Sequence, residues 1–520
     1  ADKPYDRFLL EQLAGDELAD HEQADMTPDL LDNLIATGFL RMAPDGTGSD
    51  VVNRVPERLE VISDELDIFG SVVMGLTLKC ARCHRHKYDP IPQRDYYRLV
   101  DIFKGAFDEH DWLKPASVPG QTDGLTRGRY LPYCTPEEQA AQEEFNRVLD
   151  RRIAEENAKL TALTAKLRAE HLALRLKDVD EVLRDDVRAA LETPVEKRTE
   201  IQKYLGEKFK SMQLDDAQLK KTAEYQAASR NVSLAVRSLE GPKQPEPQIR
   251  ALWDRGEPSP TYLLRRGDYL QPTRLVGPGV PSVLTDGKTQ FIAEPPPGGK
   301  STGRRLALAR WLTNPDHPLT ARVMVNRLWQ GHFGQGIVRS TGNFGKLGAP
   351  PSHPELLDWL AREFISGVGS RSSDSKTEDE IGNPRAWSMK RMHRLMMTST
   401  VYRQVSTMRD ELERLDPENE LLSRMPLRRL TAEEVNDSLL YVSGRLDERP
   451  FGRPDPVDAQ RDGLVTPVGT ASGWRRSLYV QHRRFQIPTV LETFDQPQMN
   501  PNCLERPSAT VAQQALYLMN

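Results

Sequence analysis

A long, highly charged run from Thr135 to about Glu240 divides this chain and limits the folds open to it. Glu, Lys, Arg, Ala and Leu dominate the run, and these residues favour helix. Its apolar residues recur at helical spacing, as at Leu149, Ile153 and Leu160, which makes a stripe rather than a core. A second helical stretch, Asp215–Leu239, is placed to return antiparallel and cover that stripe. We therefore expect residues 135–240 to form a long helical hairpin.

The segment before this run and the segment directly after it have different patterns. Residues 1–115 carry apolar residues at helical spacing and predict a compact α domain. Residues 241–300 are rich in proline and glycine and contain two short strand-like runs, Thr261–Leu264 and Thr273–Val276. This pattern predicts a small β-containing connector.

Residues 301–520 return to a helical pattern with clear helix starts. The spacings Ser352-x-x-Glu355 and Thr431-x-x-Glu434 each predict a capping box at the start of a helix. The expected fold class is therefore mainly α, with two α-rich domains joined by the long helical hairpin and the small β-containing connector.

Charge and hydropathy exclude two classes of partner. Lysine plus arginine number 71 against 76 aspartates and glutamates, with both signs mixed, so the chain lacks the basic field that nucleic acid needs. Its longest apolar stretches, Ser71–Leu78 and Leu439–Val442, are shorter than the roughly 20 residues of a membrane helix. We expect no nucleic-acid partner and no membrane span in this chain. The chain starts without Met or a leader-like segment, so we expect both ends to be cuts through a longer protein.

The sharpest motif is Cys80-Ala-Arg-Cys83-His84. Two thiols three positions apart can form thioethers with the two vinyl groups of one haem, and the adjacent histidine then binds the iron. We predict covalent haem c on Cys80 and Cys83, with His84 as the metal ligand. Zinc is the less favoured alternative, because the other cysteines, Cys134 and Cys503, stand singly and far away in sequence. Whether those two form a disulfide stays open.

Four side chains are candidates for catalysis: His86, Tyr88, His332 and His482. His86 suits a propionate or substrate contact, a proton carrier or a ligand to another metal, and equally a histidine that fixes a turn. We expect the second α-rich domain to pack over the haem, because an uncovered haem exposes apolar ring edge. His332 or His482 is then expected among the side chains nearest to the haem.

Arginines surround the two histidines of the second half. Arginine presents a planar fork of donors that suits an anionic or glycan ligand. Ion pairs within the protein, for example with Asp358, explain the same residues without a ligand, and we favour this structural interpretation. This interpretation concerns Arg322, Arg327 and Arg339. For the second group, Arg475, Arg476, Arg483 and Arg484, we favour a strand with alternating exposed arginines over a wall that faces haem propionates or an anionic glycan.

Both ends of the chain resemble one family. In the first part the resemblance rests on Glu11–Gly15, Leu34–Leu40, Cys80–Ile91 and Gln93–Tyr97, and in the second on Leu319–Gln330, His332–Gly334, His353–Trp359, Arg475–Tyr479 and Thr510–Tyr517. These runs resemble the paired cytochrome-associated domains of unknown function that are abundant in planctomycetes and related bacteria. The resemblance implies that residues 1–115 are the C-terminal part of the first domain. It also implies an exported, periplasmic or extracellular protein, often preceded by a further cytochrome c domain, but no established reaction.

Two functions follow as expectations. The first is an exported c-type haem redox protein, which either exchanges electrons with a redox partner protein or cytochrome, or acts as a haem c-dependent oxidoreductase on an extracellular substrate such as a glycan. The sixth ligand of the iron would decide between them. The alternative is a non-enzymatic cell-surface or glycan-binding scaffold with a structural metal or cysteine site, which forms oligomers through the hairpin. The signature motifs of nicotinamide dehydrogenases, P-loop NTPases, α/β-hydrolases and zincins are absent.

Overall fold

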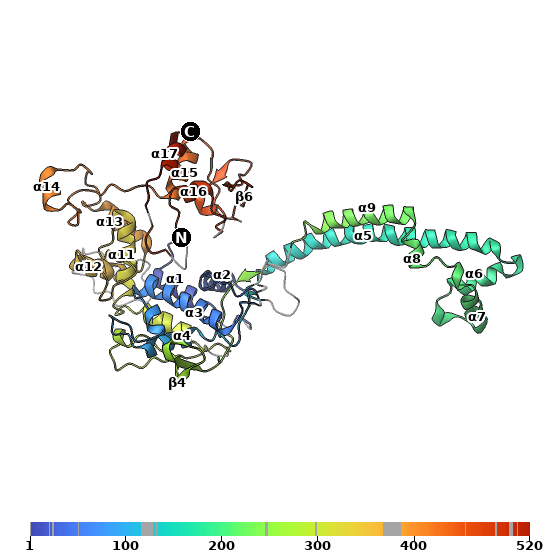
Figure 1. The fold of residues 1–520 in the computed structure, drawn as a ribbon, viewed down its shortest axis with the longest axis horizontal. Coiled ribbons are helices and arrows are strands. Elements are labelled where there is room, and N and C mark those ends of the chain that lie inside the picture. Colours follow the sequence, from blue (N-terminus) through green and yellow to red (C-terminus); the bar gives the residue numbers. More distant parts are fainter. Residues whose placement is uncertain are drawn as a thin grey trace. The chain divides into compact units, whose positions relative to one another are not determined.

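The protein is mainly α-helical, with a few short strands (Figure 1). The computed structural model describes residues 2–19, 21–22, 25–49, 51–115, 128–131, 133–244, 248–296, 299–367, 386–452, 454–483, 486–498, 503–506 and 508–519. By its internal contacts the chain divides into two compact units: unit 1 is Ala1–Leu131 with Ile249–Asn520, and unit 2 is Pro132–Gln248. No helix among the described residues is long and apolar enough to cross a membrane.

The first core of unit 1 is built by four helices and by segments far away in sequence. Local signals start these helices; at the second helix, for example, Thr27 accepts a hydrogen bond from the Leu30 amide and Pro28 takes the first helical position. The buried cluster also takes in Leu252, Val280 and Leu308, which come from the connector and from the helix after it. The four helices of this core are α1 (Tyr5–Ala14), α3 (Val55–Phe69), α4 (Gln93–Phe103) and α10 (Arg304–Leu312), and the second helix of the chain, α2 (Pro28–Thr37), packs against α1.

A buried ion pair attaches α10 to the end of α1. The Arg305 guanidinium donates to both carboxylate oxygens of Asp16, at 2.9 and 2.6 Å, and to the Leu13 carbonyl at 2.9 Å. Glu17 lies beside it, with one carboxylate oxygen 3.3 Å from Arg305. All of these side chains are buried, so the charges of Asp16 and Arg305 depend on each other.

The second core of unit 1 lies among α11 (Thr320–Phe333), α12 (Pro354–Ser366) and α13 (Met389–Thr398). Beyond it follow α14 (Asp410–Leu415), α15 (Ala432–Val442), α16 (Thr489–Thr493) and α17 (Ala512–Met519). The capping box predicted at Thr431 and Glu434 is confirmed, because each side chain bonds the other residue's amide at the start of α15. The one predicted at Ser352 and Glu355 is wrong, because α12 begins at Pro354 after His353, with no side-chain hydrogen bond at the cap.

The strands form two-stranded pairs. Antiparallel β1 (Tyr130–Leu131) and β2 (Ile249–Arg250) hold the two points at which unit 1 connects to unit 2. The strand-like runs of the connector are confirmed as antiparallel β3 (Thr261–Leu264) and β4 (Pro272–Val276). The remaining pairs are parallel β5 (Leu446–Asp447) with β8 (Trp474–Arg475), and antiparallel β6 (Val457–Ala459) with β7 (Val465–Pro467).

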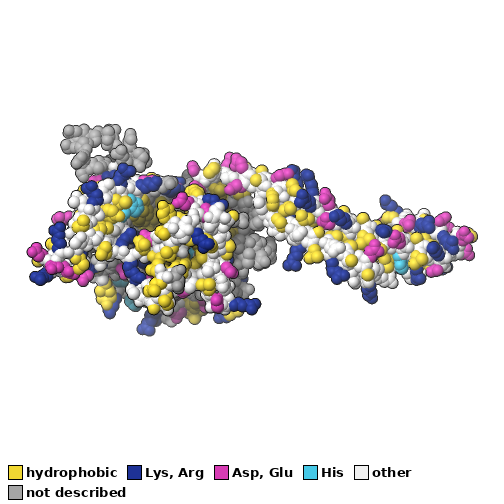
Figure 2. All heavy atoms as spheres, turned by 90° about the horizontal axis from the view of Figure 1, so that it is seen from above, with side chains coloured by type: hydrophobic (Ala, Val, Ile, Leu, Met, Phe, Trp, Pro, Cys, Tyr) yellow, Lys and Arg dark blue, Asp and Glu magenta, His cyan; other side chains and the backbone are white. Residues whose placement is uncertain are grey.

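Unit 2 begins with the long helix α5 (Pro136–Arg175), which Thr135 and Glu138 start with a capping box. It continues through α6 (Arg184–Glu192), α7 (Glu200–Lys208), α8 (Asp216–Leu219) and α9 (Ala223–Glu240), and α9 lies alongside α5 (Figure 1). A small apolar core gathers the residues Leu172, Leu176, Val179, Val187, Ala190, Leu191 and Leu205. Figure 2 shows charges of both signs interspersed over these helices, so the face in view has no patch of one sign.

Candidate functional site

The Cys80–His84 motif lies on a short exposed turn of unit 1. A 3₁₀ helix spans Lys79–Arg82, so that Cys80 lies within it and Cys83 directly follows it. Both cysteines are exposed, while Ala81 between them is fully buried. The buried Ala81 side chain thus fixes the turn to the core, while the two thiols are exposed to solvent.

Side chains of α4 hold the backbone of this turn. The Arg82 carbonyl accepts hydrogen bonds from the Gln93 amide at 2.8 Å and from the Tyr97 hydroxyl at 2.9 Å. Gln93 also donates to the Leu264 carbonyl of β3 at 2.9 Å. Next to Cys83 stands Gly267, with a φ of 74°, and a Cβ atom there would come within 2.8 Å of the Cys83 sulfur. The absence of a side chain at Gly267 therefore provides the space that the Cys83 sulfur occupies.

His84 is exposed and has one ring nitrogen engaged. Its Nδ1 lies 2.6 Å from the Arg85 carbonyl, and a carbonyl only accepts, so Nδ1 carries the proton of this hydrogen bond. In the neutral ring Nε2 then keeps its lone pair. This is the arrangement that a metal-binding histidine uses, with one nitrogen oriented by a carbonyl and the other ready to bind.

His86 is buried and both of its nitrogens bond within the protein. Its Nδ1 accepts from the Asp89 amide at 2.9 Å, and its Nε2 lies 3.2 Å from the Thr77 hydroxyl. Asp89 in turn accepts from the Lys346 amide at 2.7 Å. Of the roles we weighed for His86, these contacts favour the one that fixes a turn. Tyr88 is exposed, and the Lys87 ammonium lies 5.2 Å from the centre of its ring.

The motif carries the kinds of group that covalent haem uses: two exposed thiols and a histidine whose Nε2 has no hydrogen-bond partner among the described residues. No three His, Cys, Asp or Glu side chains in the described part of the chain gather closely enough to hold a metal ion. Cys503 is not disulfide-bonded, and its sulfur lies 2.9 Å from the Glu505 carbonyl.

His332 makes its contacts in the second core. Its Nε2 lies 2.8 Å from Nδ1 of His393, and its ring meets the Tyr402 ring edge-on. Burial lowers the pKa of His332, and the nearby His393 and Arg428 lower it further. A neutral His332 suits the short contact, because one of the two nitrogens must accept the hydrogen bond.

His482 is exposed and lines a different cavity of about 420 Å³. The second half nevertheless reaches the segments beside the motif through one loop: the Phe344 amide donates to the Gly75 carbonyl at 2.7 Å, and Lys346 bonds Asp89. None of the described contacts of His332 or His482 is with Cys80–His84, so their expected place near a haem stays a prediction.

Most of the arginines near these histidines form ion pairs, as the structural interpretation predicts for the group around His332. The strand of exposed arginines expected around His482 is wrong for Arg475, which is buried at the end of the two-residue strand β8. Arg484 lies outside the described residues. Arg322 pairs with Asp358 at 2.7 Å, and buried Arg475 pairs with Asp455 at 2.7 Å. Arg476 pairs with Asp437 at 3.1 Å, Arg339 with Glu420 at 2.6 Å, and Arg327 donates to the Ser71 carbonyl at 3.4 Å.

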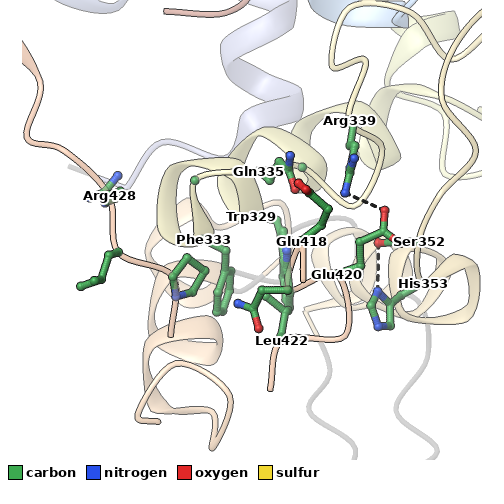
Figure 3. A pocket seen from close by; sticks show the side chains of 15 residues that line it. Trp329, Phe333, Gln335, Arg339, Ser352, His353, Glu418, Glu420, Leu422 and Arg428 are labelled. Atoms are coloured by element: carbon green, nitrogen blue, oxygen red, sulfur yellow. Dashed lines mark hydrogen bonds and ion pairs between the residues drawn. The ribbon is translucent and has the colours of Figure 1, made fainter. Parts of the chain in front are cut away.

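Sequence patterns did not point to a pocket of about 330 Å³ beside the second core (Figure 3). The stacked rings of Trp329 and Phe333 line it, with Gln335, His353 and Glu418 among its polar groups. The pair of Arg339 with Glu420 crosses it. Its carboxylates, Glu418 and Glu420, come from an irregular segment far from α11 in sequence, and no local sequence motif indicates that these segments come together.

Two protein families match the chain. PSCyt2, a protein of unknown function (DUF1549), matches residues 1–107, which include the motif, and PSD1, a protein of unknown function (DUF1553), matches residues 304–520, which include the pocket of Figure 3. No curated protein and no solved structure matches the chain. The chain therefore contains a PSCyt2 domain in its first part and a PSD1 domain in its second, from two planctomycete-type, cytochrome-associated families of unknown function.

Proposed function

We propose that the Cys80–His84 turn is a haem c attachment site and that the protein is an exported c-type haem redox protein. The observation that carries this proposal is the joint exposure of both thiols in one short turn, next to a histidine whose Nε2 has no hydrogen-bond partner among the described residues. Haem c is normally attached outside the cytoplasm in bacteria, so the proposal includes a periplasmic or extracellular location.

Each residue of the turn has a distinct role in this proposal. The Cys80 and Cys83 thiols each add across one vinyl group, with sulfur bonding one carbon and hydrogen the other, so that the addition consumes no oxidant. His84 offers Nε2 to the iron, and the Arg85 carbonyl holds its ring orientation through Nδ1. Bound haem would supply a one-electron redox couple.

The surroundings of the turn favour electron exchange with a partner over a buried reaction. Lys79 is paired with Asp64 at 2.7 Å, but Arg85 and Lys87 are exposed and make no ion pair within the described chain. These two cations suit haem propionates or an acidic patch on a redox protein. Catalytic roles for His86, Tyr88, His332 and His482 stay predictions.

The test is the intact mass of denatured protein after export through a cytochrome c maturation system. We expect a haem adduct in the wild type, no adduct in the double variant Cys80→Ser with Cys83→Ser, and an unchanged adduct in the control Cys503→Ser. His84→Met should retain folding and alter the visible spectrum of the reduced protein. A correctly exported wild type without added mass would refute the proposal.

The pocket of Figure 3 favours a second candidate function, binding of a glycan by the PSD1 domain. Aromatic rings beside amide, imidazole and carboxylate groups are typical of sugar sites, because a sugar has apolar faces and a polar rim. Titration with cellohexaose and maltohexaose tests this function. Glu418→Gln should weaken binding, and Glu411→Gln, on exposed α14, should not.

A further inference from the structure

The cavity that His482 lines, of about 420 Å³, lies in the part of unit 1 that matches PSD1. It is bordered by α15, by the loop that follows β8, by the start of α16 and by Arg506. Its volume falls within the range of small-molecule sites, about 300–1,000 Å³. It shares no lining residue with the pocket of Figure 3, so it is a separate site.

Hydrogen bonds to α15 fix one wall of this cavity. Asp437 accepts from the amide and from the hydroxyl of Ser477, both at 2.7 Å. Asn436, one position earlier on α15, donates to the Ser477 hydroxyl oxygen at 3.0 Å. These bonds hold the loop after β8 against the helix, so the side chains of that loop have a defined place in the lining.

The apolar part of the lining is aliphatic. Leu491 of α16 is 2% exposed and belongs to a small buried cluster, and Val480, Ile487 and Pro488 line the cavity with it. Among the described residues of the lining, His482 carries the only aromatic ring. The cavity therefore offers an apolar surface, but not the large flat rings on which sugar faces stack.

Two of the three arginines in the lining are paired with its two carboxylates. Arg476 pairs with Asp437 through Nε at 3.1 Å, and Arg506 pairs with Glu433 through Nη1 at 2.6 Å. A guanidinium has five N–H donors, and each of these pairs uses one nitrogen. The two arginine side chains are 60% and 47% exposed, so a ligand can reach the donors that remain.

The third arginine, Arg483, is exposed and makes no ion pair among the described residues. Its Nη1 donates to the side-chain oxygen of Gln486 at 3.2 Å. A single exposed arginine is ordinary on a protein surface. Arg483, however, lines a cavity together with two other guanidiniums and only two carboxylates, which leaves one positive charge in excess.

Charge and apolar surface together favour one class of ligand. A cation is disfavoured by the excess positive charge, and a neutral sugar would place hydroxyls against the aliphatic wall without partners. An inorganic anion would use the guanidiniums but leave the aliphatic wall without an apolar partner. An organic ion with one negative charge matches both the charge and the wall, because guanidinium forks bind carboxylate and sulfate oxygens well.

We propose that this cavity binds an organic monoanion, a carboxylate or sulfate ester on an apolar body. The anionic group accepts hydrogen bonds from Arg483 and from the remaining donors of Arg476 and Arg506, and the apolar body packs against Leu491 and Ile487. This site goes beyond the proposed haem attachment and does not require it.

Calorimetric titration of the full chain with cyclohexanecarboxylate tests the proposal, and cyclohexanecarboxamide, which has nearly the same shape without the charge, is the matched probe. Hydrogen bonds to a charged group contribute enough that we expect the carboxylate to bind at least about tenfold more tightly than the amide. Equal affinity for these two probes would overturn the ionic contact.

Two further probes test the anionic group and the apolar contact. Of cyclohexanecarboxylate and cyclohexyl sulfate, the ion that binds more tightly identifies the preferred anionic group, and no binding of either would overturn the site. Inorganic sulfate lacks the apolar body and should bind at least about tenfold more weakly than the tighter organic anion. Inorganic sulfate that bound as tightly would overturn the apolar contact.

Two variants locate the binding. Arg483→Gln should weaken binding of the tighter anion at least about fivefold and leave binding of the amide unchanged. Leu478→Glu places a negative charge in the lining at a side chain that is 76% exposed, and it should weaken anion binding at least about tenfold. The controls Arg461→Gln and Leu415→Glu, at exposed positions outside the cavity, should bind as the wild type does. Binding that persists unchanged in both Arg483→Gln and Leu478→Glu would place the anion elsewhere and refute the proposal.

The variant Cys80→Ser with Cys83→Ser separates this site from haem attachment. It should bind the tighter anion as the wild type does, because the cavity shares no lining residue with the cysteine turn. Failure of haem attachment is read from the intact mass and failure of the anion site from the calorimetric titration, so each proposal can fall without the other.

Discussion

Replacing Arg305 by methionine tests whether the buried ion pair joins the PSCyt2 and PSD1 segments into one folded unit. The side chain keeps much of its length but loses its charge and three hydrogen bonds, two to Asp16 and one to the Leu13 carbonyl. Asp16 then stays buried without a counter-charge. Removing one partner of a buried ion pair typically costs about 3–5 kcal/mol. Burial raises the pKa of Glu17 to about 8, so Glu17 can take up a proton and adds little to that cost.

Tryptophan fluorescence during urea unfolding measures this cost in the right part of the chain, because all 7 tryptophans lie in unit 1. We expect Arg305→Met to lower the free energy of unfolding by about 3–5 kcal/mol at pH 7. The control Arg310→Met, exposed on the same helix, should change it by less than about 0.5 kcal/mol.

A triple variant separates the lost charge balance from lost packing. Arg305→Met combined with Asp16→Asn and Glu17→Gln removes all three ionisable groups and keeps acceptors for the Asp254 and Leu306 amides, which the Asp16 and Glu17 side chains bond at 2.7 Å. We expect it to be more stable than Arg305→Met alone. The reasoning fails if the single variant costs less than about 1 kcal/mol, or if the triple variant is no more stable than the single one.

Three further predictions concern other parts of the chain. Burial raises the pKa of Glu65 from 4.5 to about 8, so between these pH values the folded state holds a proton that the unfolded state has released. The free energy of unfolding should therefore fall as pH rises from 5 to 8, by at most about 1.4 kcal/mol per pH unit. Urea unfolding at pH 5 and pH 8 measures this fall, which should be smaller in Glu65→Gln. Gly267→Ala should cost more stability and change the rate of Cys83 alkylation more than Gly287→Ala, because both positions have positive φ but only Gly267 would place a Cβ against the Cys83 sulfur. Replacing residues 132–248 by Asn-Gly joins β1 to β2 through a dipeptide that closes antiparallel pairs, and it should leave the tryptophan fluorescence and the haem content unchanged. Loss of haem from a folded variant would show that unit 2 contributes to the haem site.

Local patterns were enough to predict much of the secondary structure. Helical spacing, the capping box at Thr431 and the short strand-like run of β3 depend on neighbours a few residues away, and the structure has these elements as expected. The Cys80–His84 motif is local in the same sense, because the side chains that define it lie within five adjacent residues.

Tertiary structure decided which distant residues meet. Glu109 and Tyr262 line one cavity, and His332 bonds His393, although nothing near these residues in sequence indicates either meeting. Arg305 contacts Asp16 across 289 positions. Local preferences act over a few residues, whereas such contacts arise when apolar faces pack and buried polar groups must find partners. The sequence by itself therefore determined the helices and the exposed cysteine motif, and only packing decided which buried side chains, charges and cavities surround that motif.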